Sequence, residues 1–177
     1  EGLFAGLDVR PAAPPAAAPA AAPRSAIDAP DVSGCTPLVL ASRAAYRRAR
    51  EPGALLQCVA LLVSHGADLA AASVHDGRPP LFFAAALGAT DVVAMMLARR
   101  ADPDARCLGG LSALHFAAAH GAIGSVRMLL ARGAQPELVD GDGRLPVAHA
   151  LRGVPGHSLP GEGHAECHAL LLRHLAR

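Results

Sequence analysis

The sequence predicts an all-α protein, a solenoid of about four helix-turn-helix units with finger turns, preceded by a disordered tether. Three observations predict this fold class. An apolar pattern occurs four times after residue 30, and the last three copies are spaced 33 residues apart. Glycine-containing pairs that end helices or form turns recur at matching places in the copies. The chain is 52% hydrophobic but only 3% aromatic, which suits closely packed helices with small side chains.

The first 30 residues contain two segments of different composition. Residues 1–9 form a candidate short linear motif with four bulky apolar side chains. These are Leu3, Phe4, Leu7 and Val9. Residues 10–30 alternate proline with alanine. Because proline removes backbone donors and alanine buries little area, we expect residues 10–30 to be a disordered, semi-stiff linker.

Each copy of the repeated pattern is expected to begin a helix. The copies lie at 35–42, 78–85, 111–118 and 144–151. In the third copy, Leu114, Ala117 and Ala118 have helical spacing. The pair Gly121-Ala122 is then expected to end the helix, because glycine adopts a left-handed conformation at little cost.

A second, more apolar helix is expected in each unit, followed by an extended finger. Gly66 and Gly133 would end two of these helices, which are rich in residues such as Val92 and Val126. One unit cannot cover two apolar helix faces by itself, so the units are expected to stack in register. Turns at the finger tips are predicted by the Asp-Gly or Gly-Gly pairs at 76–77, 109–110 and 142–143.

These patterns resemble the ankyrin repeat, whose consensus reads D-x-x-G-x-T-P-L-H-x-A-A, then a turn, an apolar helix and G-A-D. The match is densest at Leu114, His115, Ala117, Ala118 and Gly121. The resemblance covers residues 31–177, with units at about 31–72, 73–105, 106–139 and 140–177. It implies a non-enzymatic protein-protein interaction module or scaffold. It also implies that His115 donates a hydrogen bond to the backbone of the neighbouring finger.

Two insertions depart from the repeat pattern, and both fall between the first and second helices of a unit. The first lies within residues 42–57 and can lengthen the helix by two turns or form a loop before Pro52-Gly53. In the helical alternative, Arg43, Arg47 and Arg50 share one face. The second insertion lies within 153–164, before a last helix at 165–177. The fourth unit is either a C-terminal cap or one member of an array that continues beyond Arg177.

The resemblance implies that a partner binds in a concave groove lined by the finger tips and the first helices. Two leucines in the third finger, Leu108 and Leu111, occupy positions where polar residues are usual. They either form a contact surface or bury each other against the next finger. The residues carried over to this groove are His75, Asp76, Arg78, Leu108, Leu111, Asp142, Arg144, Arg43 and Arg152.

The N-terminal tail resembles a second known pattern. Residues 3–9 are similar to the tepsin-type motif Leu-Phe-x-Gly-Leu/Met-x-Leu/Val, which docks on the appendage domain of a vesicle-coat adaptor complex. The matching residues are Leu3, Phe4, Gly6, Leu7 and Val9. The resemblance implies an accessory protein of such a complex. The alternative is that this segment caps the first repeat.

Local signatures of catalysis are absent from the sequence, which contains no G-x-S-x-G, H-E-x-x-H or phosphate-binding loop. We therefore expect no enzymatic activity and no cofactor. A zinc site is the weakest alternative, in which His164, Cys167 and His168 come close on one helix. A polar face on a terminal helix explains the same residues.

Charge and cysteine usage restrict the partners and the compartment. The formal net charge is +1, so the chain lacks the positive field that non-specific nucleic-acid binding requires. The sequence has no apolar run of about 20 residues, so we expect no membrane insertion. The four cysteines form no C-x-x-C pair, which indicates reduced thiols in a cytoplasmic or nuclear protein.

Overall fold

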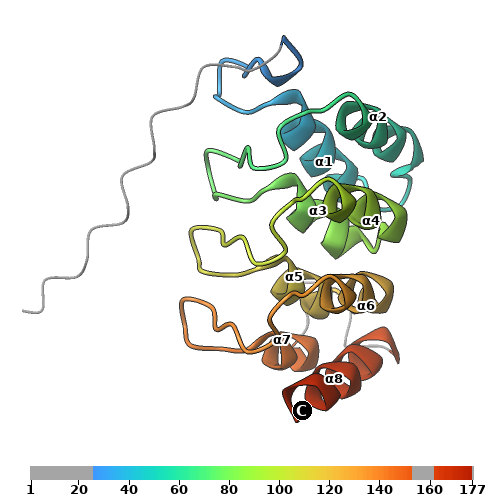
Figure 1. The fold of residues 1–177 in the computed structure, drawn as a ribbon, viewed down its shortest axis with the longest axis vertical. Coiled ribbons are helices and arrows are strands. Elements are labelled where there is room, and N and C mark those ends of the chain that lie inside the picture. Colours follow the sequence, from blue (N-terminus) through green and yellow to red (C-terminus); the bar gives the residue numbers. More distant parts are fainter. Residues whose placement is uncertain (1–25, 153–161, 177) are drawn as a thin grey trace, which may run out of the picture.

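The computed structural model describes residues 26–152 and 162–176, and within these ranges the chain forms four stacked pairs of α-helices preceded by one short 3-10 helix (Figure 1). The fingers project together from one side of the stack (Figure 1). The elements are η1 (Ala26–Asp28), α1 (Pro37–Arg47), α2 (Gly53–Ser64), α3 (Pro80–Leu87), α4 (Thr90–Ala98), α5 (Ala113–Ala119), α6 (Ile123–Ala131), α7 (Pro146–Arg152) and α8 (Glu162–Leu175). This confirms the predicted all-α solenoid.

Helices α3, α5 and α7, each the first of its pair, are short and lie between their neighbours in the stack. α5 spans 7 residues, and Leu114, Ala117 and Ala118 are buried completely. Small side chains on these helices let adjacent units approach closely. The helix ends where Gly121 adopts a left-handed φ of 65°, as the sequence predicted.

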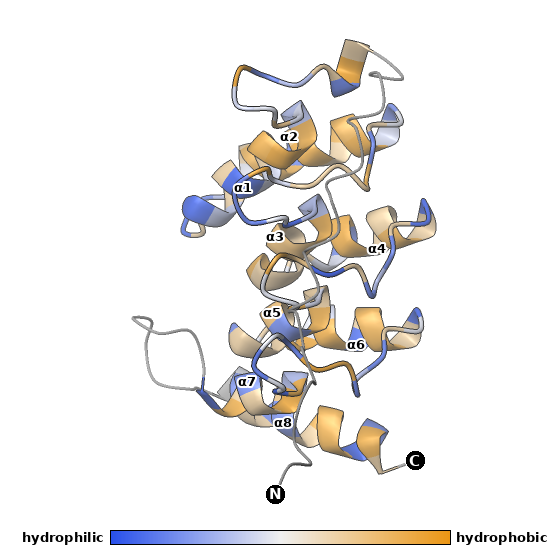
Figure 2. Ribbon diagram, turned by 90° about the vertical axis from the view of Figure 1, so that its left-hand side faces the viewer, coloured by the Kyte–Doolittle hydropathy of each residue, from blue (hydrophilic) through white to orange (hydrophobic). Residues whose placement is uncertain are grey.

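The second helices cover the first from outside and complete one continuous core. Val93, Met96, Val126 and Leu129 are buried completely, and they belong to the same apolar cluster as the first helices. Figure 2 shows hydrophobic residues concentrated in the helices and more polar residues in many of the connecting loops. The stack therefore buries apolar faces that one helix pair cannot cover by itself.

The fingers are joined to one another by backbone hydrogen bonds. The amide of Leu108 donates to the carbonyl of Asp76 at 3.1 Å. The amide of Gly141 donates to the carbonyl of Gly109 at 2.9 Å. These bonds set the spacing of the second, third and fourth fingers, so side chains at their tips lie in one row.

The structure corrects three boundaries predicted from the sequence. Residues 26–28, which were assigned to the disordered linker, form η1, and the amide of Asp68 donates to the Asp28 carboxylate at 2.8 Å. The first insertion lengthens α1 to 11 residues, after which a short loop leads to Gly53. Arg50 lies in this loop and does not share the helical face of Arg43 and Arg47. The last helix, predicted at 165–177, begins at Glu162 and ends at Leu175, so the end of the second insertion is helical. The rest of the linker, residues 1–9 and residues 153–161 of the second insertion lie outside the described residues.

Candidate functional site

The fingers and the helices α1, α3, α5 and α7 form one face, which we call the inner surface. The structure places most of the predicted groove residues on its fingers. Leu108 is 76% exposed, His75 and Asp142 are exposed, and Asp76 and Arg78 are half-buried. On the helices, Arg43 is half-buried in α1 and Arg152 is exposed at the end of α7.

The two leucines of the third finger do not behave alike. Leu111 is half-buried and packs against the apolar core, so it exposes less apolar surface than Leu108. Leu108 is largely exposed, and its side chain and backbone both lie against Gly77 of the preceding finger, where an added Cβ would be 3.0 Å from Leu108 Cγ and 3.1 Å from its amide nitrogen. Leu108 is thus the exposed apolar side chain of this finger.

Aromatic side chains from three units form a continuous group at the inner surface, which we call the aromatic band; Phe83 is its buried member, and the other three rings are half-buried. It consists of Tyr46, Phe83, Phe116 and His120. The ring of Tyr46 lies 6.0 Å from Phe83 and 5.4 Å from His120. The ring of Phe116 stacks with His120 at 6.4 Å. Helix α1 therefore reaches past α3 to contact the end of α5.

Hydrogen bonds fix the position of Tyr46 and His120 within the aromatic band. His120 Nδ1 donates to the Phe116 carbonyl at 2.9 Å, so its Nε2 is left as an acceptor for the Tyr46 hydroxyl at 2.7 Å. Burial raises the pKa of the Tyr46 phenol, which keeps the hydroxyl protonated as a donor. These bonds fix the orientation of two of the four rings in the absence of a partner.

Arginine side chains lie beside the aromatic band. The guanidinium carbon of Arg78 is 4.6 Å from the centre of the Phe116 ring, and its Nε is 3.2 Å from the Asp76 carboxylate. The end of α1 and the loop after it carry the arginine cluster, which is Arg43, Arg47, Arg48 and Arg50. Within residues 26–152 and 162–176, none of these four arginines forms an ion pair. Figure 2 shows this loop as polar and projecting beside the first helices.

Sequence reasoning missed the aromatic band. Phe83 and Phe116 occupy the same position of the repeat, 33 residues apart, and this was the one signal in the sequence. Tyr46 lies in the insertion, which has no counterpart in the other units. Its contact with His120, 74 residues away, has no local pattern that could have predicted it.

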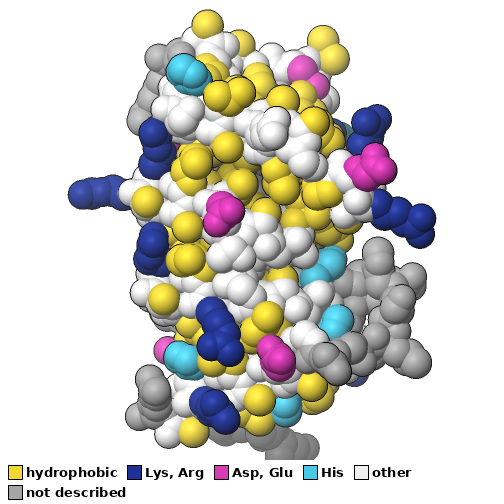
Figure 3. Space-filling model, turned by 90° about the vertical axis from the view of Figure 1, so that its right-hand side faces the viewer, with side chains coloured by type: hydrophobic (Ala, Val, Ile, Leu, Met, Phe, Trp, Pro, Cys, Tyr) yellow, Lys and Arg dark blue, Asp and Glu magenta, His cyan; other side chains and the backbone are white. Residues whose placement is uncertain are grey.

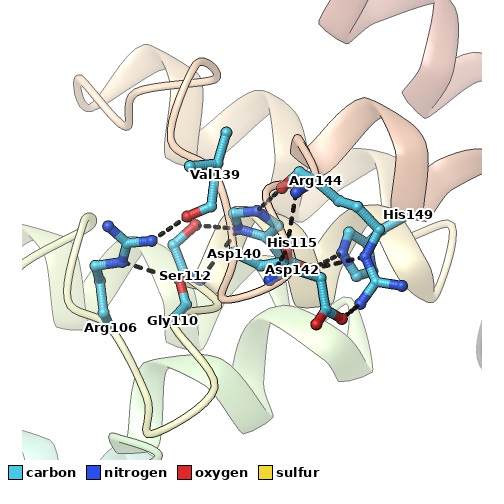
Figure 4. Close-up of polar contacts among 9 residues, drawn as sticks. All are labelled: Arg106, Gly110, Ser112, His115, Val139, Asp140, Asp142, Arg144 and His149. Carbon is cyan, nitrogen blue, oxygen red and sulfur yellow. Dashed lines mark hydrogen bonds and ion pairs between the residues drawn. The ribbon is translucent and has the colours of Figure 1, made fainter. Parts of the chain in front are cut away.

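A buried polar network, the fourth-finger network, holds the fourth finger on the third unit (Figure 4). Its members are Ser112, His115, Asp140, Arg144 and His149. The Ser112 amide donates to His115 Nδ1 at 3.1 Å, so His115 Nε2 carries the proton that it donates to the Arg144 carbonyl at 3.2 Å. This bond is the one that the resemblance implied for His115. Arg144, predicted as a groove residue, also has this structural role.

Asp140 is the acceptor at the centre of the fourth-finger network. Its Oδ1 accepts from the amides of Asp142 and Arg144 at 2.9 and 2.8 Å. Its Oδ2 accepts from Arg144 Nε at 3.1 Å and from His149 Nε2 at 2.8 Å. Burial by itself would raise the pKa of this carboxyl, but the hydrogen bonds outweigh burial and hold the pKa below its usual range.

The titration of His115 predicts a pH dependence of stability. Burial lowers the pKa of His115 from 6.5 to about 4. Below pH 6.5 the unfolded chain binds a proton at this histidine and the folded chain does not. The free energy of unfolding is therefore unaffected by His115 above pH 6.5 and decreases as the pH falls toward 4. Between pH 7.5 and 5 we expect a loss of about 2 kcal/mol from this group, measured by urea unfolding at both pH values. His115→Gln removes the titration and should flatten this dependence. An equally steep pH dependence in this variant would contradict the assignment.

The three candidate zinc ligands do not converge. His164 Nε2 donates to the Ala119 carbonyl at 3.1 Å, and Cys167 is buried completely. Burial raises the pKa of the Cys167 thiol to about 11, which opposes the thiolate that zinc requires. Among the residues that the structure describes, no group of three His, Cys, Asp or Glu side chains could hold a metal ion.

A shallow pocket lies on the other side of the molecule, between α2 and α4. It is lined mainly by small and apolar residues, including Leu56, Ala60 and Val92, and Asp91 is its one titratable residue. Figure 3 shows apolar side chains gathered on the face opposite the fingers. This pocket lacks the converging polar groups of a catalytic site. In the described ranges, no helix is both long and apolar enough to span a membrane.

The stacked helix pairs with fingers define a repeat solenoid, a class of protein that presents an extended binding surface. A family model of three ankyrin repeats matches residues 44–140. The chain belongs to the ankyrin-repeat family, whose domains are in general non-catalytic modules for protein-protein interaction. Among curated proteins, none matches the chain.

Proposed function

We propose that the chain is a non-enzymatic interaction module that binds a partner protein on its inner surface, with the aromatic band and Arg78 at the centre of the contact. The observation that carries this proposal is the placement of Arg78 over Phe116, beside Tyr46. The chain is only 3% aromatic, yet rings from α1, α3 and α5 meet at this one face. Tyrosine and arginine are enriched among the residues that dominate binding energy at protein interfaces.

The surroundings of the aromatic band support the same proposal. Leu108 supplies an exposed aliphatic side chain at the finger edge, and the arginine cluster supplies cations at the opposite edge. Hydrogen bonds hold the side chains of Tyr46 and His120 in place, so these two rings lose little conformational entropy when a partner binds. The remaining predicted groove residues, His75, Asp142 and Arg152, would form the polar rim of this contact.

Substitution at the finger edge tests this proposal. Leu108→Asp places a charge at an exposed apolar contact and leaves the core intact, so partner capture from cell extract should fall at least tenfold, about 1.4 kcal/mol. The matched control is Leu172→Asp, which makes the same change at a side chain that is 47% exposed on α8. Quantitative mass spectrometry of both captures gives the comparison. Equal catches from the two variants would contradict binding at the inner surface.

A second candidate function rests on the tail. The match of Leu3, Phe4, Gly6, Leu7 and Val9 to the tepsin-type motif supports docking to an adaptor-complex appendage domain, in a cytoplasmic accessory protein of vesicle coats. A motif on a tether beside a folded module permits simultaneous binding at two sites. We place either function in the cytoplasm or the nucleus, which the four free cysteines support. Phe4→Ala with Leu7→Ala should remove adaptor subunits from the captured proteins.

A further inference from the structure

We propose that the inner surface binds a short acidic-apolar segment, and that the chain's own residues 3–9 are such a segment, bound in cis. This inference rests on the proposed function, since it names the occupant of the same surface. It joins three observations: an aromatic band, an arginine cluster that forms no ion pair with any residue the structure describes, and a tail whose composition complements both.

The receptor side combines apolar and cationic groups. Phe116 and Tyr46 are half-buried, so parts of both rings remain accessible beside the guanidinium of Arg78. Arg47 and Arg48 are exposed at the end of the helix that carries Tyr46. A ligand that covers the rings therefore brings its own charges close to these arginines. A carboxylate on such a ligand gains attraction, and a cation is repelled.

Residues 1–9 have the complementary composition. Four bulky apolar side chains lie within residues 3–9. The carboxylate of Glu1 precedes them, and that of Asp8 lies between the last two. Residues 1–9 contain no lysine or arginine, and Arg10 follows the segment. The apolar side chains match the aromatic band, and the two carboxylates match the arginine cluster.

Ala26, the first described residue, lies next to the repeat unit that carries the arginine cluster, so the tail is attached close to its proposed binding surface. Ala26 starts η1, and Asp28 is bound to the Asp68 amide in the first unit, which also carries the arginine cluster. Residues 10–25 link this point to the segment. Sixteen residues of Pro/Ala composition span about 50 Å when fully extended. A linker of this length gives an effective concentration of about 1 mM, so a segment with a Kd of about 0.1 mM would be bound about 90% of the time.

A paramagnetic label on the tail tests the contact in the whole chain. Cys58 is the one exposed cysteine, so Cys58→Ser with Gly2→Cys directs a nitroxide to the N-terminus. We expect strong loss of amide NMR intensity at Tyr46, Phe116 and His120, and little loss at Leu172 on α8. Phe4→Ala with Leu7→Ala should restore the intensity on the inner surface, whereas Ala12→Ser with Ala13→Ser, a matched change in the linker, should not.

Absence of intensity loss on the inner surface would overturn the inference, and so would three patterns of loss. They are intensity loss spread equally over both faces, loss unchanged by Phe4→Ala with Leu7→Ala, and loss that arises only between labelled and unlabelled chains in a mixed sample. The last outcome would assign the segment to a second copy. Arg47→Glu with Arg48→Glu provides a test on the receptor side, because both side chains are exposed and their reversal leaves the core intact. This variant should also restore the intensity.

Failure of this inference is distinguishable from failure of the proposed function. If residues 3–9 occupy the surface, Phe4→Ala with Leu7→Ala should increase capture of the partner by about tenfold, the factor set by about 90% occupancy. If the label shows no contact but Leu108→Asp still reduces capture, the surface binds a partner and the cis segment is excluded. If neither effect is seen, both proposals fall.

Discussion

Gly121→Ala is expected to destabilise the protein by about 3 kcal/mol, from left-handed strain and overpacking together. Gly121 has a φ of 65°, which an alanine adopts only at a cost. An added Cβ would also lie 2.7 Å from Nδ1 of His164. That ring is held by its hydrogen bond to the Ala119 carbonyl, so it cannot move without breaking the contact between α5 and α8.

Gly133→Ala is the matched control for this prediction. Gly133 has a φ of 89°, but no atom lies within 4 Å of its added Cβ. Its substitution should cost about 1 kcal/mol, which is the left-handed strain by itself. Urea unfolding of both variants at pH 7.5 measures the difference. Equal losses would show that His164 does not pack on Gly121.

Asp140→Ala is expected to cost about 3 kcal/mol or more, because it leaves the donors of Arg144 and His149 without their buried acceptor. Four hydrogen bonds end on this carboxylate. Its pKa lies below the usual value of 3.8, so its contribution to stability is complete above pH 4 and is lost only at lower pH. At pH 7.5 the full cost should therefore be seen.

Asp31→Ala is the control at the equivalent position of the first finger. The Asp31 carboxylate accepts hydrogen bonds from Ser33 and from the Cys35 amide, but it is exposed to solvent. Water can replace these bonds, so we expect a clearly smaller loss of stability than for Asp140→Ala. Comparable losses in the two variants would contradict a special role for the fourth-finger network.

Most of the fold could be predicted from short-range patterns in the sequence. The 33-residue step, the buried positions of Leu114 and Ala117 and the left-handed glycines at 66 and 133 were all predicted from neighbouring residues. Helix formation and helix termination depend on spacing and on backbone conformation within a few residues, so they can be derived locally. The start of the folded part was misplaced because η1 is held by a distant contact, that of Asp28 with Asp68.

In the candidate site, too, some residues were predicted from the sequence and others were placed only by tertiary packing. The sequence by itself determined that exposed finger residues such as Leu108 and Asp142 lie in one row, because repetition puts equivalent positions side by side. Only the tertiary structure decided that Leu111 turns into the core and that Tyr46 crosses to His120. These outcomes depend on how neighbouring units pack and on an insertion without a repeat counterpart. A contact between residues 74 positions apart is set by the stacking of three units and leaves no periodic trace in the chain.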